Sequence, residues 1–157
     1  MNNNPGCVYL IGAGPGDPDL ISVKGKRLLE QCDVVIYDAL VNNILTATLP
    51  DRIQKIYVGK RGGKPSAEQE EINRLLVSHA REGKMVVRLK GGDPLLLGRG
   101  SEEMEYLREQ GIPYQIIPGI SSALAAPACA GIPVTHRSLS RSVAIVTGHL
   151  MAGESVE

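Results

Sequence analysis

The sequence predicts an α/β fold: a mainly parallel five-stranded sheet with flanking helices. Short apolar, β-branched runs alternate with helical stretches along most of the chain, and this alternation is typical of βαβ crossovers. The 18 glycines and 10 prolines gather at the ends of the apolar runs, which indicates the loops of an ordered domain. Ligands of such sheets bind beyond the carboxyl ends of the strands, so these loops are the expected site.

The first elements form a strand–helix–strand unit. Residues 7–11 (CVYLI) are a continuous apolar run, which predicts a buried strand ending at the Gly/Pro loop 12–18. Residues 20–31 predict a helix, because leucines recur on one side of it. Residues 33–37 (DVVIY) are rich in β-branched side chains and predict the second strand.

The middle of the chain continues the alternation. Residues 42–48 predict a short helix or turn, and residues 53–58 predict the third strand. Ser66 is the expected N-cap of the next helix, with Gln69 completing a capping box. The inner face of that helix is formed by side chains at helical spacing: Ile72, Leu75, Leu76 and His79.

The last part of the chain adds further strands and helices. Residues 85–89 predict the fourth strand, and a helix is expected at 101–110 before a glycine stop. Residues 114–117 predict the fifth strand, followed by a helix of small residues at 120–129. The apolar run at 142–146 is expected to be the last strand.

Charge and cysteine content exclude several classes of function. Lys and Arg number 17, as do Asp and Glu, and zero net charge argues against a general surface for nucleic acid or anionic membranes. No apolar run approaches the roughly 20 residues that span a bilayer, and the N-terminus lacks the features of a signal peptide. The three cysteines, Cys7, Cys32 and Cys129, lie far apart, which predicts reduced thiols, no metal site and a cytoplasmic location.

The first glycine loop, Gly12-Ala13-Gly14-Pro15-Gly16-Asp17, lies between a predicted strand and a predicted helix. A dinucleotide fingerprint would have its third glycine where this chain has Asp17, and a carboxylate there opposes a pyrophosphate. Asp38 lies about where the ribose-binding acid of such a site is found, so a nicotinamide-dependent oxidoreductase domain remains an alternative. An acidic glycine loop otherwise suits a ligand that carries positive charge or ribose hydroxyls.

The second glycine loop, Gly91-Gly92-Asp93-Pro94, follows the fourth predicted strand. Its two glycines allow the backbone to approach a ligand closely. Asp93 either caps the following turn or accepts hydrogen bonds from the amino group or hydroxyls of a ligand. Both readings stay open at the level of sequence.

Basic residues also gather near the strand ends, on a chain of zero net charge, and together they suggest an anionic ligand: Lys60, Arg61, Lys64, Arg88, Arg99 and Arg137. Arg88 differs from the others because a central strand of a parallel sheet is buried on both faces. A buried guanidinium is costly unless a carboxylate pairs with it. We therefore expect Arg88 to have an acidic partner.

Segments spread along the chain closely resemble the tetrapyrrole methylase superfamily, and within it the members that methylate uroporphyrinogen III. These segments are Val8–Ser22, Val34–Val41, Val58–Gly63, Val86–Gly100, Ile117–Ser122, Gly131–Arg137 and Val146–Leu150. The VRLKGGDP and VGKRGG segments distinguish these members from the precorrin methylases and the ribosomal-RNA ribose methylase of the same fold.

The resemblance implies an activity and a set of site residues. The activity is methyl transfer from S-adenosylmethionine to carbons 2 and 7 of uroporphyrinogen III, giving precorrin-2 for sirohaem and cobalamin. By matching position, the implied contacts to the donor come from Pro15, Gly91, Gly92, Asp93, Leu96, Ser121 and Ser122. Asp38 is the implied proton acceptor and Lys60 the implied proton donor. Substrate carboxylates are the expected partners of Arg61, Lys64, Arg88, Arg99 and Arg137.

Members of this superfamily have a second α/β domain, and the donor binds in the cleft between the two. Residues 7–147 are therefore expected to be the N-terminal domain and residues 148–157 the start of an interdomain linker. On this view the chain alone is a poor methyltransferase or a non-catalytic binding fragment, and the full-length protein is a homodimer. Ala39 stands where many members have Arg, and Ser121-Ser122 where Thr-Ala is common; both departures are mild, and the first is expected to alter contacts to the substrate.

Overall fold

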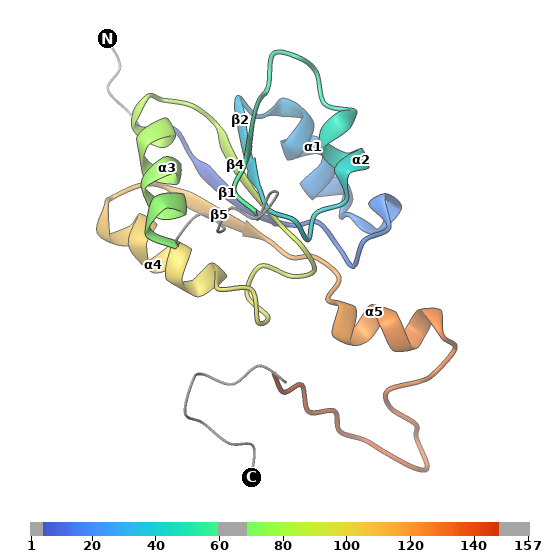
Figure 1. The fold of residues 1–157 in the computed structure, drawn as a ribbon. Coiled ribbons are helices and arrows are strands. Elements are labelled where there is room, and N and C mark those ends of the chain that lie inside the picture. Colours follow the sequence, from blue (N-terminus) through green and yellow to red (C-terminus); the bar gives the residue numbers. More distant parts are fainter. Residues whose placement is uncertain (1–4, 60–68, 148–157) are drawn as a thin grey trace. The chain divides into compact units, whose positions relative to one another are not determined.

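The computed structural model describes residues 5–59 and 69–147 of the chain. It divides the chain into two compact units, Met1–Ser122 and Ala123–Glu157, which are described separately. The first unit holds a five-stranded sheet whose strands are β1 (Val8–Gly12), β2 (Val34–Tyr37), β3 (Gln54–Tyr57), β4 (Val86–Lys90) and β5 (Tyr114–Ile117). The strand order is β3-β2-β4-β1-β5, and all four pairings are parallel (Figure 1). The predicted fold class is confirmed.

The register of the sheet brings the carboxyl ends of the strands level with one another. Gly12, the last residue of β1, is paired with Lys90, the last residue of β4. Ile117 at the end of β5 pairs with Ile11, and Tyr37 at the end of β2 pairs with Leu89. The loops that follow these strands therefore leave the sheet along one edge.

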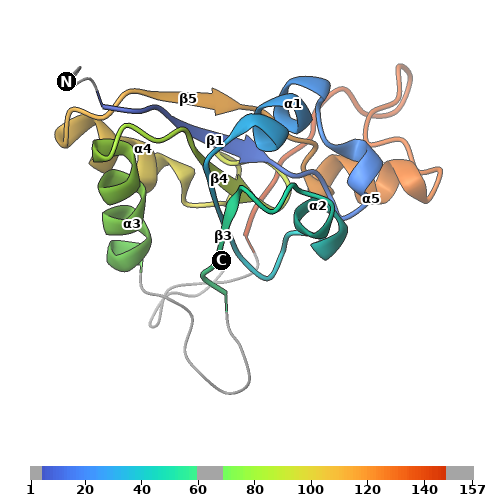
Figure 2. The same cartoon turned by 90° about the horizontal axis from the view of Figure 1, so that it is seen from above.

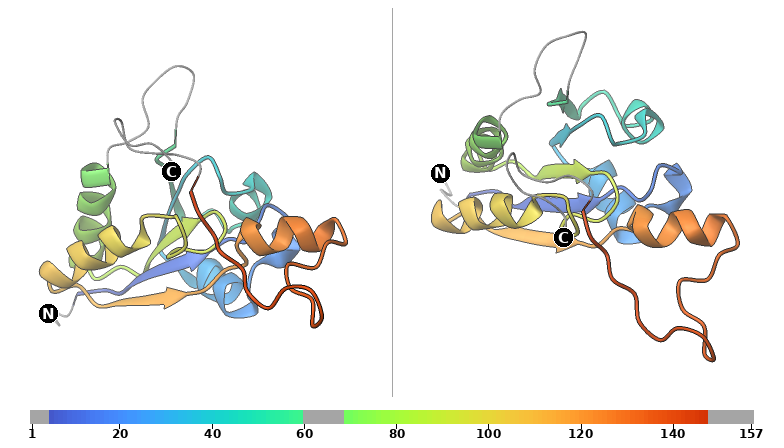
Figure 3. Two further views of the ribbon diagram at one scale, coloured as in Figure 1. Left: turned by 90° about the horizontal axis from the view of Figure 1, so that it is seen from below. Right: turned by 60° about the horizontal axis from the view of Figure 1, so that its bottom comes forward.

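Helices cover both faces of the sheet (Figures 2 and 3). On one face lie α1 (Val23–Gln31) and α2 (Asn43–Ala47), and on the other lie α3 (Gln69–Arg81) and α4 (Gly100–Glu109). The helix that follows β1, α1, lies on the first face, and the helix that follows β4, α4, lies on the second. The chain thus leaves the neighbouring strands β1 and β4 towards opposite faces of the sheet. In an open sheet, ligands bind at such a divergence, beyond the carboxyl ends of the two strands.

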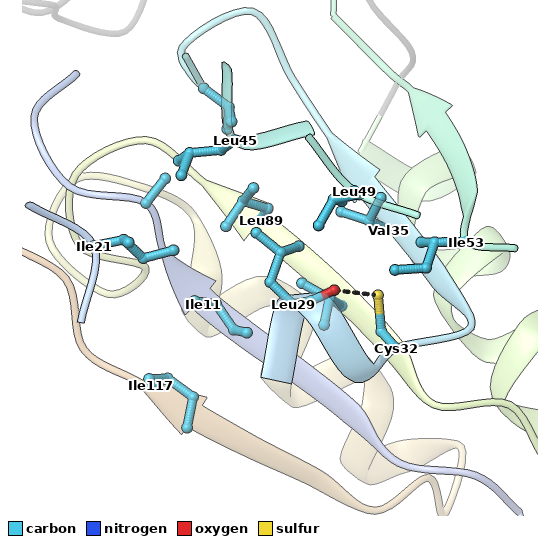
Figure 4. Packing of buried hydrophobic residues seen from close by; sticks show 13 residues of the cluster. Ile11, Ile21, Leu29, Cys32, Val35, Leu45, Leu49, Ile53, Leu89 and Ile117 are labelled. Carbon is cyan, nitrogen blue, oxygen red and sulfur yellow. Dashed lines mark hydrogen bonds between the residues drawn. The ribbon is translucent and has the colours of Figure 1, made fainter. Parts of the chain in front are cut away.

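Two apolar clusters, one on each face, form the core of the first unit. The cluster beneath α1 and α2 includes Ile11, Leu29 and Leu89, all at most 1% exposed, and Figure 4 shows how they interdigitate. In the same cluster the Cys32 thiol donates to the Leu29 carbonyl at 3.1 Å. The opposite cluster joins Leu10 to Leu76 and to Leu107, so each helix of that face is fixed by an apolar stripe.

The predicted helix at 20–31 begins later than expected. Residues Pro18–Leu20 form a separate 3₁₀ turn whose N-cap is Asp17, with the Asp17 carboxylate accepting from the Asp19 amide at 2.9 Å. Ser22 then caps α1, since its hydroxyl accepts from the Gly25 amide at 3.1 Å. The Ser22 cap therefore starts α1 at Val23, three residues after the predicted start at Leu20. The predicted cap at Ser66 lies outside the described residues.

The prediction of a strand at 142–146 is wrong. The segment carries no strand, and Val143, Ile145 and Val146 are 47%, 38% and 82% exposed. A strand needs a hydrogen-bonded neighbour, which apolar alternation alone does not supply. The second unit instead contains most of α5 (Ser122–Cys129) and a tight turn in which His136 and Ser140 exchange backbone hydrogen bonds at 2.8 and 3.0 Å.

The part of the chain that the structure describes contains no helix long and apolar enough to cross a bilayer.

Candidate functional site

The glycine loops after β1 and β4 meet at the carboxyl edge of the sheet. The Gly14 amide donates to the Gly92 carbonyl at 3.2 Å, and the Gly92 amide donates back to Gly14 at 2.7 Å. Gly14 has a φ of 83° and Gly92 a φ of 64°, a region that side chains other than glycine rarely adopt. The expectation that these two loops share one edge is therefore confirmed.

The loop after β5 packs against the same two loops through bare backbone. A Cβ atom on Gly12 would lie 2.5 Å from the Gly119 Cα atom and 2.6 Å from the Gly92 oxygen. A Cβ on Gly119 would lie 2.2 Å from the same Gly92 oxygen. Three strand ends are thus held together by glycine–glycine contacts that leave no room for a methyl group. Sequence reasoning did not single out Gly12 or Gly119 for this packing, although both stand directly after apolar runs.

Asp93 ties two of these loops together. Its Oδ1 atom accepts from the amides of Leu95 and Leu96 at 2.9 and 3.2 Å, and its Oδ2 atom accepts from the Gly119 amide at 3.1 Å. Asp93 therefore caps the turn that follows it, which is one of the two roles that the sequence had left open for this residue. Both oxygens are already hydrogen-bonded within the protein, so Asp93 first of all shapes the edge.

The other residues matched to donor binding lie on the same loops. The position of a Cβ on Gly92 would be 3.8 Å from the Ser121 Cα atom, with no other atom nearer. Pro15 precedes Gly16, whose carbonyl accepts from the Asn42 side-chain amide at 2.7 Å, which connects the first loop to the start of α2. Leu96 is 36% exposed, and Ser122 is the first residue of α5.

Asp38 stands at the same edge, directly after β2. Its Oδ1 atom accepts from the Leu40 amide at 3.0 Å, and its Oδ2 atom accepts from the Arg88 guanidinium at 2.9 Å. The side chain is 24% exposed, so solvent still reaches it. A ribose-binding acid should have its carboxylate available for two hydroxyls. The ion pair with Arg88 therefore counts against the dinucleotide reading.

Beneath Asp38 lies a cluster of three buried charged side chains and one partly buried amide, which we call the Glu103 network: Arg88, Lys90, Glu103 and Gln69. The Glu103 Oε1 atom accepts from Arg88 Nε at 3.1 Å, from Lys90 Nζ at 3.0 Å and from Gln69 Nε2 at 3.1 Å. Glu103 is fully buried, and Arg88 and Lys90 are 3% and 4% exposed. The expectation of an acidic partner for Arg88 is confirmed twice, by Asp38 and by Glu103.

The Arg88 guanidinium is occupied by protein groups in this arrangement, and direct substrate binding by Arg88 stays a prediction. Besides its two carboxylates, Arg88 donates through Nη1 to the carbonyls of Leu89 and Ile36, at 3.0 and 3.4 Å. Each guanidinium nitrogen is therefore engaged inside the protein. Burial, together with the charge of Arg88, lowers the pKa of Lys90 below its usual value, while Glu103 opposes that shift.

Glu103 is the functional candidate that sequence reasoning missed. A signal was present, because Glu103 and Leu107 are four residues apart on α4 and so lie on one helix face. Leu107 is fully buried, and this places Glu103 on the side of α4 that faces β4. Without the strand order, however, nothing indicated that Arg88 and Lys90 lie opposite.

The remaining basic residues that were predicted to act at the site do not form one cluster in the described part of the chain. Lys60, Arg61 and Lys64 lie outside the described residues. Arg99 is exposed, has a φ of 56° and forms a two-bond ion pair with Glu102, at 2.8 and 2.9 Å. Arg137 is exposed within the second unit.

Comparison with known proteins places these features in a family. A sequence model of the family described as Tetrapyrrole (Corrin/Porphyrin) Methylases matches residues 7–156. The chain is 56% identical to uroporphyrinogen-III C-methyltransferase of Methanocaldococcus jannaschii over 92% of its length, and 53% identical to that of Bacillus subtilis over 97%. It covers 60% and 59% of those two relatives.

The fold of this chain is also similar to that of a solved structure. The uroporphyrin-III C-methyltransferase of Thermus thermophilus, crystallised with S-adenyl homocysteine, superposes with a TM-score of 0.79 at 45% sequence identity. The match covers 97% of this chain and 60% of that one. The chain thus spans about three fifths of the length of these relatives.

Proposed function

The chain belongs to the tetrapyrrole methylase family, and from that premise we propose that it supplies the donor-binding edge of an S-adenosylmethionine-dependent methyltransferase. We propose uroporphyrinogen III as the acceptor. The observation that carries the proposal is the junction of three glycine loops at one edge of the sheet, after β1, β4 and β5. The relatives named uroporphyrinogen-III C-methyltransferase and the Thermus thermophilus complex support the choice of acceptor and donor.

The chemistry of this edge fits the donor better than it fits a phosphate ligand. It consists of backbone amides and carbonyls, serine hydroxyls and the carboxylate of Asp93. Among the described residues, a Cβ on Gly92 would meet only the Ser121 Cα atom, at 3.8 Å, and this open space allows a ligand to reach the backbone. These groups suit an adenosine and an amino-acid tail. When bound, the donor supplies an electrophilic methyl group, and most of the rate should then come from alignment of the two reactants.

Methyl transfer to a fully substituted pyrrole carbon leaves a positive charge on the ring, and the ring becomes neutral again when it loses a proton from another position. We propose Asp38 as the residue that accepts it, because its carboxylate is at the carboxyl edge, partly exposed and held by Leu40 and Arg88. Lys60 is retained as the proposed proton donor on the resemblance alone. Arg61, Lys64, Arg99 and Arg137 are retained as proposed contacts to the carboxylates of the substrate.

The experiment is a methyl-transfer assay on the natural full-length protein. Transfer of radiolabelled methyl groups from S-adenosylmethionine to uroporphyrinogen III is expected, and Asp38→Asn should lower kcat by about 100-fold, the usual share of an acid–base residue. Glu105→Gln, an exposed charge change on α4, is the matched control and should leave the rate unchanged. Absence of transfer together with tight binding of a nicotinamide cofactor would support the oxidoreductase alternative.

A further inference from the structure

We propose that Glu103 is a positioning residue, which sets the orientation of the Asp38 carboxylate by holding Arg88 between them. The inference deepens the function proposed above, because it rests on Asp38 being the proton-accepting group. No contact joins Glu103 to Asp38 directly; Arg88 is hydrogen-bonded to both, through Nε at 3.1 Å and through Nη2 at 2.9 Å.

Strand geometry explains why Arg88 lies between the two carboxylates. Val86, Arg88 and Lys90 alternate along β4 and so point to the same face of the sheet, where Val86 belongs to the cluster beneath α3 and α4. Ile36 on β2 is paired with Arg88 in the register. Asp38, two residues further along, points to that face as well. This face of the sheet therefore changes from apolar to charged as it approaches the carboxyl edge.

Arg88 is a stiff link because its whole guanidinium is fixed. Its planar group is bound by Glu103 at one nitrogen, by the carbonyls of Leu89 and Ile36 at a second, and by Asp38 at the third. A planar fork with fixed donors transmits orientation, unlike the flexible ammonium of a lysine. Movement of the Glu103 side chain would therefore be passed on to Asp38.

The composition of the network also favours a role beyond stability. Buried ion pairs are often replaced by apolar side chains without loss of stability, yet this cluster keeps three charged side chains that are at least 96% buried. Glu103 Oε1 accepts three donors, whereas its buried Oε2 atom has no hydrogen-bond partner among the residues that the structure describes. Such an unpartnered atom is costly. A network kept at this cost is consistent with a positioning function.

The test is a double-mutant cycle on the natural full-length protein, with kcat, KM for uroporphyrinogen III and the Kd of S-adenosylhomocysteine as readouts. Glu103→Gln keeps the shape of the side chain and removes its charge. We expect kcat to fall about tenfold or more, as small misplacements of a reacting group do, with KM and Kd changed less than about threefold. In the Asp38→Asn background, the same change should alter kcat by less than about twofold, because coupled residues are not additive.

Each outcome separates the two proposals. An unchanged kcat in Asp38→Asn would refute the role of Asp38. A tenfold fall for Glu103→Gln in both backgrounds would refute the positioning role of Glu103 while leaving Asp38 in place, and so would an unchanged kcat for Glu103→Gln alone. Glu105→Gln, on the exposed side of α4, controls for the loss of a carboxylate.

Glu103→Gln leaves two buried cations with one carboxylate, and a second variant separates a loss of folding from a loss of positioning. Lys90→Met combined with Glu103→Gln removes one charge of each sign and leaves the Arg88–Asp38 pair. We expect this variant to keep a cooperative thermal transition and still to show a kcat about tenfold below the parent. Full recovery of kcat would show that Glu103 only balances charge and would overturn the inference.

Discussion

Gly12→Ala is the substitution that most sharply tests the packing of the three loops. The added methyl group would lie 2.5 Å from the Gly119 Cα atom, 2.6 Å from the Gly119 nitrogen and 2.6 Å from the Gly92 oxygen. All three atoms belong to the backbone, so no side chain can rotate away to relieve the overlap. Relief requires the ends of β1, β4 and β5 to move apart.

The size of the effect follows from those contacts. Overpacking of a well-packed region usually costs about 1–3 kcal/mol, and three backbone contacts below 3.0 Å place Gly12→Ala at the upper end, about 3 kcal/mol. For a chain of this size that corresponds to a Tm lower by about 6–12 °C. The displaced loops should also weaken S-adenosylhomocysteine binding about tenfold or more, which equals about 1.4 kcal/mol.

Circular dichroism melts and titration calorimetry measure the two effects. Gly83→Ala is the matched control, since Gly83 has a φ of 78° but its added Cβ meets no atom of the described residues within 4 Å, and it lies at the other end of the sheet, before β4. It should cost about 1 kcal/mol for its left-handed backbone and leave binding unchanged. A Gly12→Ala protein that melts and binds like Gly83→Ala would refute the packing argument.

Further substitutions and reagents test the other features. Arg88→Leu should lower the unfolding free energy by about 3–5 kcal/mol in urea titrations, because it removes one of the two cations paired with buried Glu103 and leaves Asp38 without its ion-pair partner. Asp93→Ala removes the acceptor of three backbone amides and should raise the Kd of S-adenosylhomocysteine about tenfold by calorimetry, with a smaller effect on Tm than Arg88→Leu. Burial raises the pKa of the Cys32 thiol to about 12, so mass spectrometry should find Cys129, which is exposed, alkylated first at pH 8 and Cys32 only after unfolding. Because the Cys32 thiol ionises at a lower pH in the unfolded chain than in the folded protein, ionisation favours unfolding. The contribution of the buried thiol to the unfolding free energy should therefore be intact below about pH 9 and decline towards pH 12.

Most of the sheet could be predicted because each strand is a short apolar run that ends at glycine or proline. The run CVYLI became β1 at Val8–Gly12, and the run DVVIY became β2 at Val34–Tyr37. The burial of Arg88, and its need for a carboxylate, followed from its place on a strand expected to be central. The identity of the partners did not, because Glu103 is 15 residues away on a helix whose facing strand is set by the strand order.

The contacts within the edge were equally out of reach of sequence reasoning. Gly12 and Gly119 touch because β5 lies beside β1, a neighbour relation that local patterns do not encode. The prediction of a strand at 142–146 failed for a related reason. The alternating apolar residues have the pattern of a strand, but the pattern supplies no neighbouring strand to pair with it. Local patterns therefore predicted elements well and contacts between distant elements poorly.

The most direct test of donor binding at the carboxyl edge is an amide chemical-shift map of the ¹⁵N-labelled chain titrated with S-adenosylhomocysteine. We expect saturable shifts at Gly14, Gly91, Gly92 and Ser121, and none near Gly83 at the opposite edge. An equal titration with NAD should leave those amides unmoved. Shifts confined to the opposite edge, or an NAD response at Gly14 and Gly92 in place of the S-adenosylhomocysteine response, would contradict the proposed site.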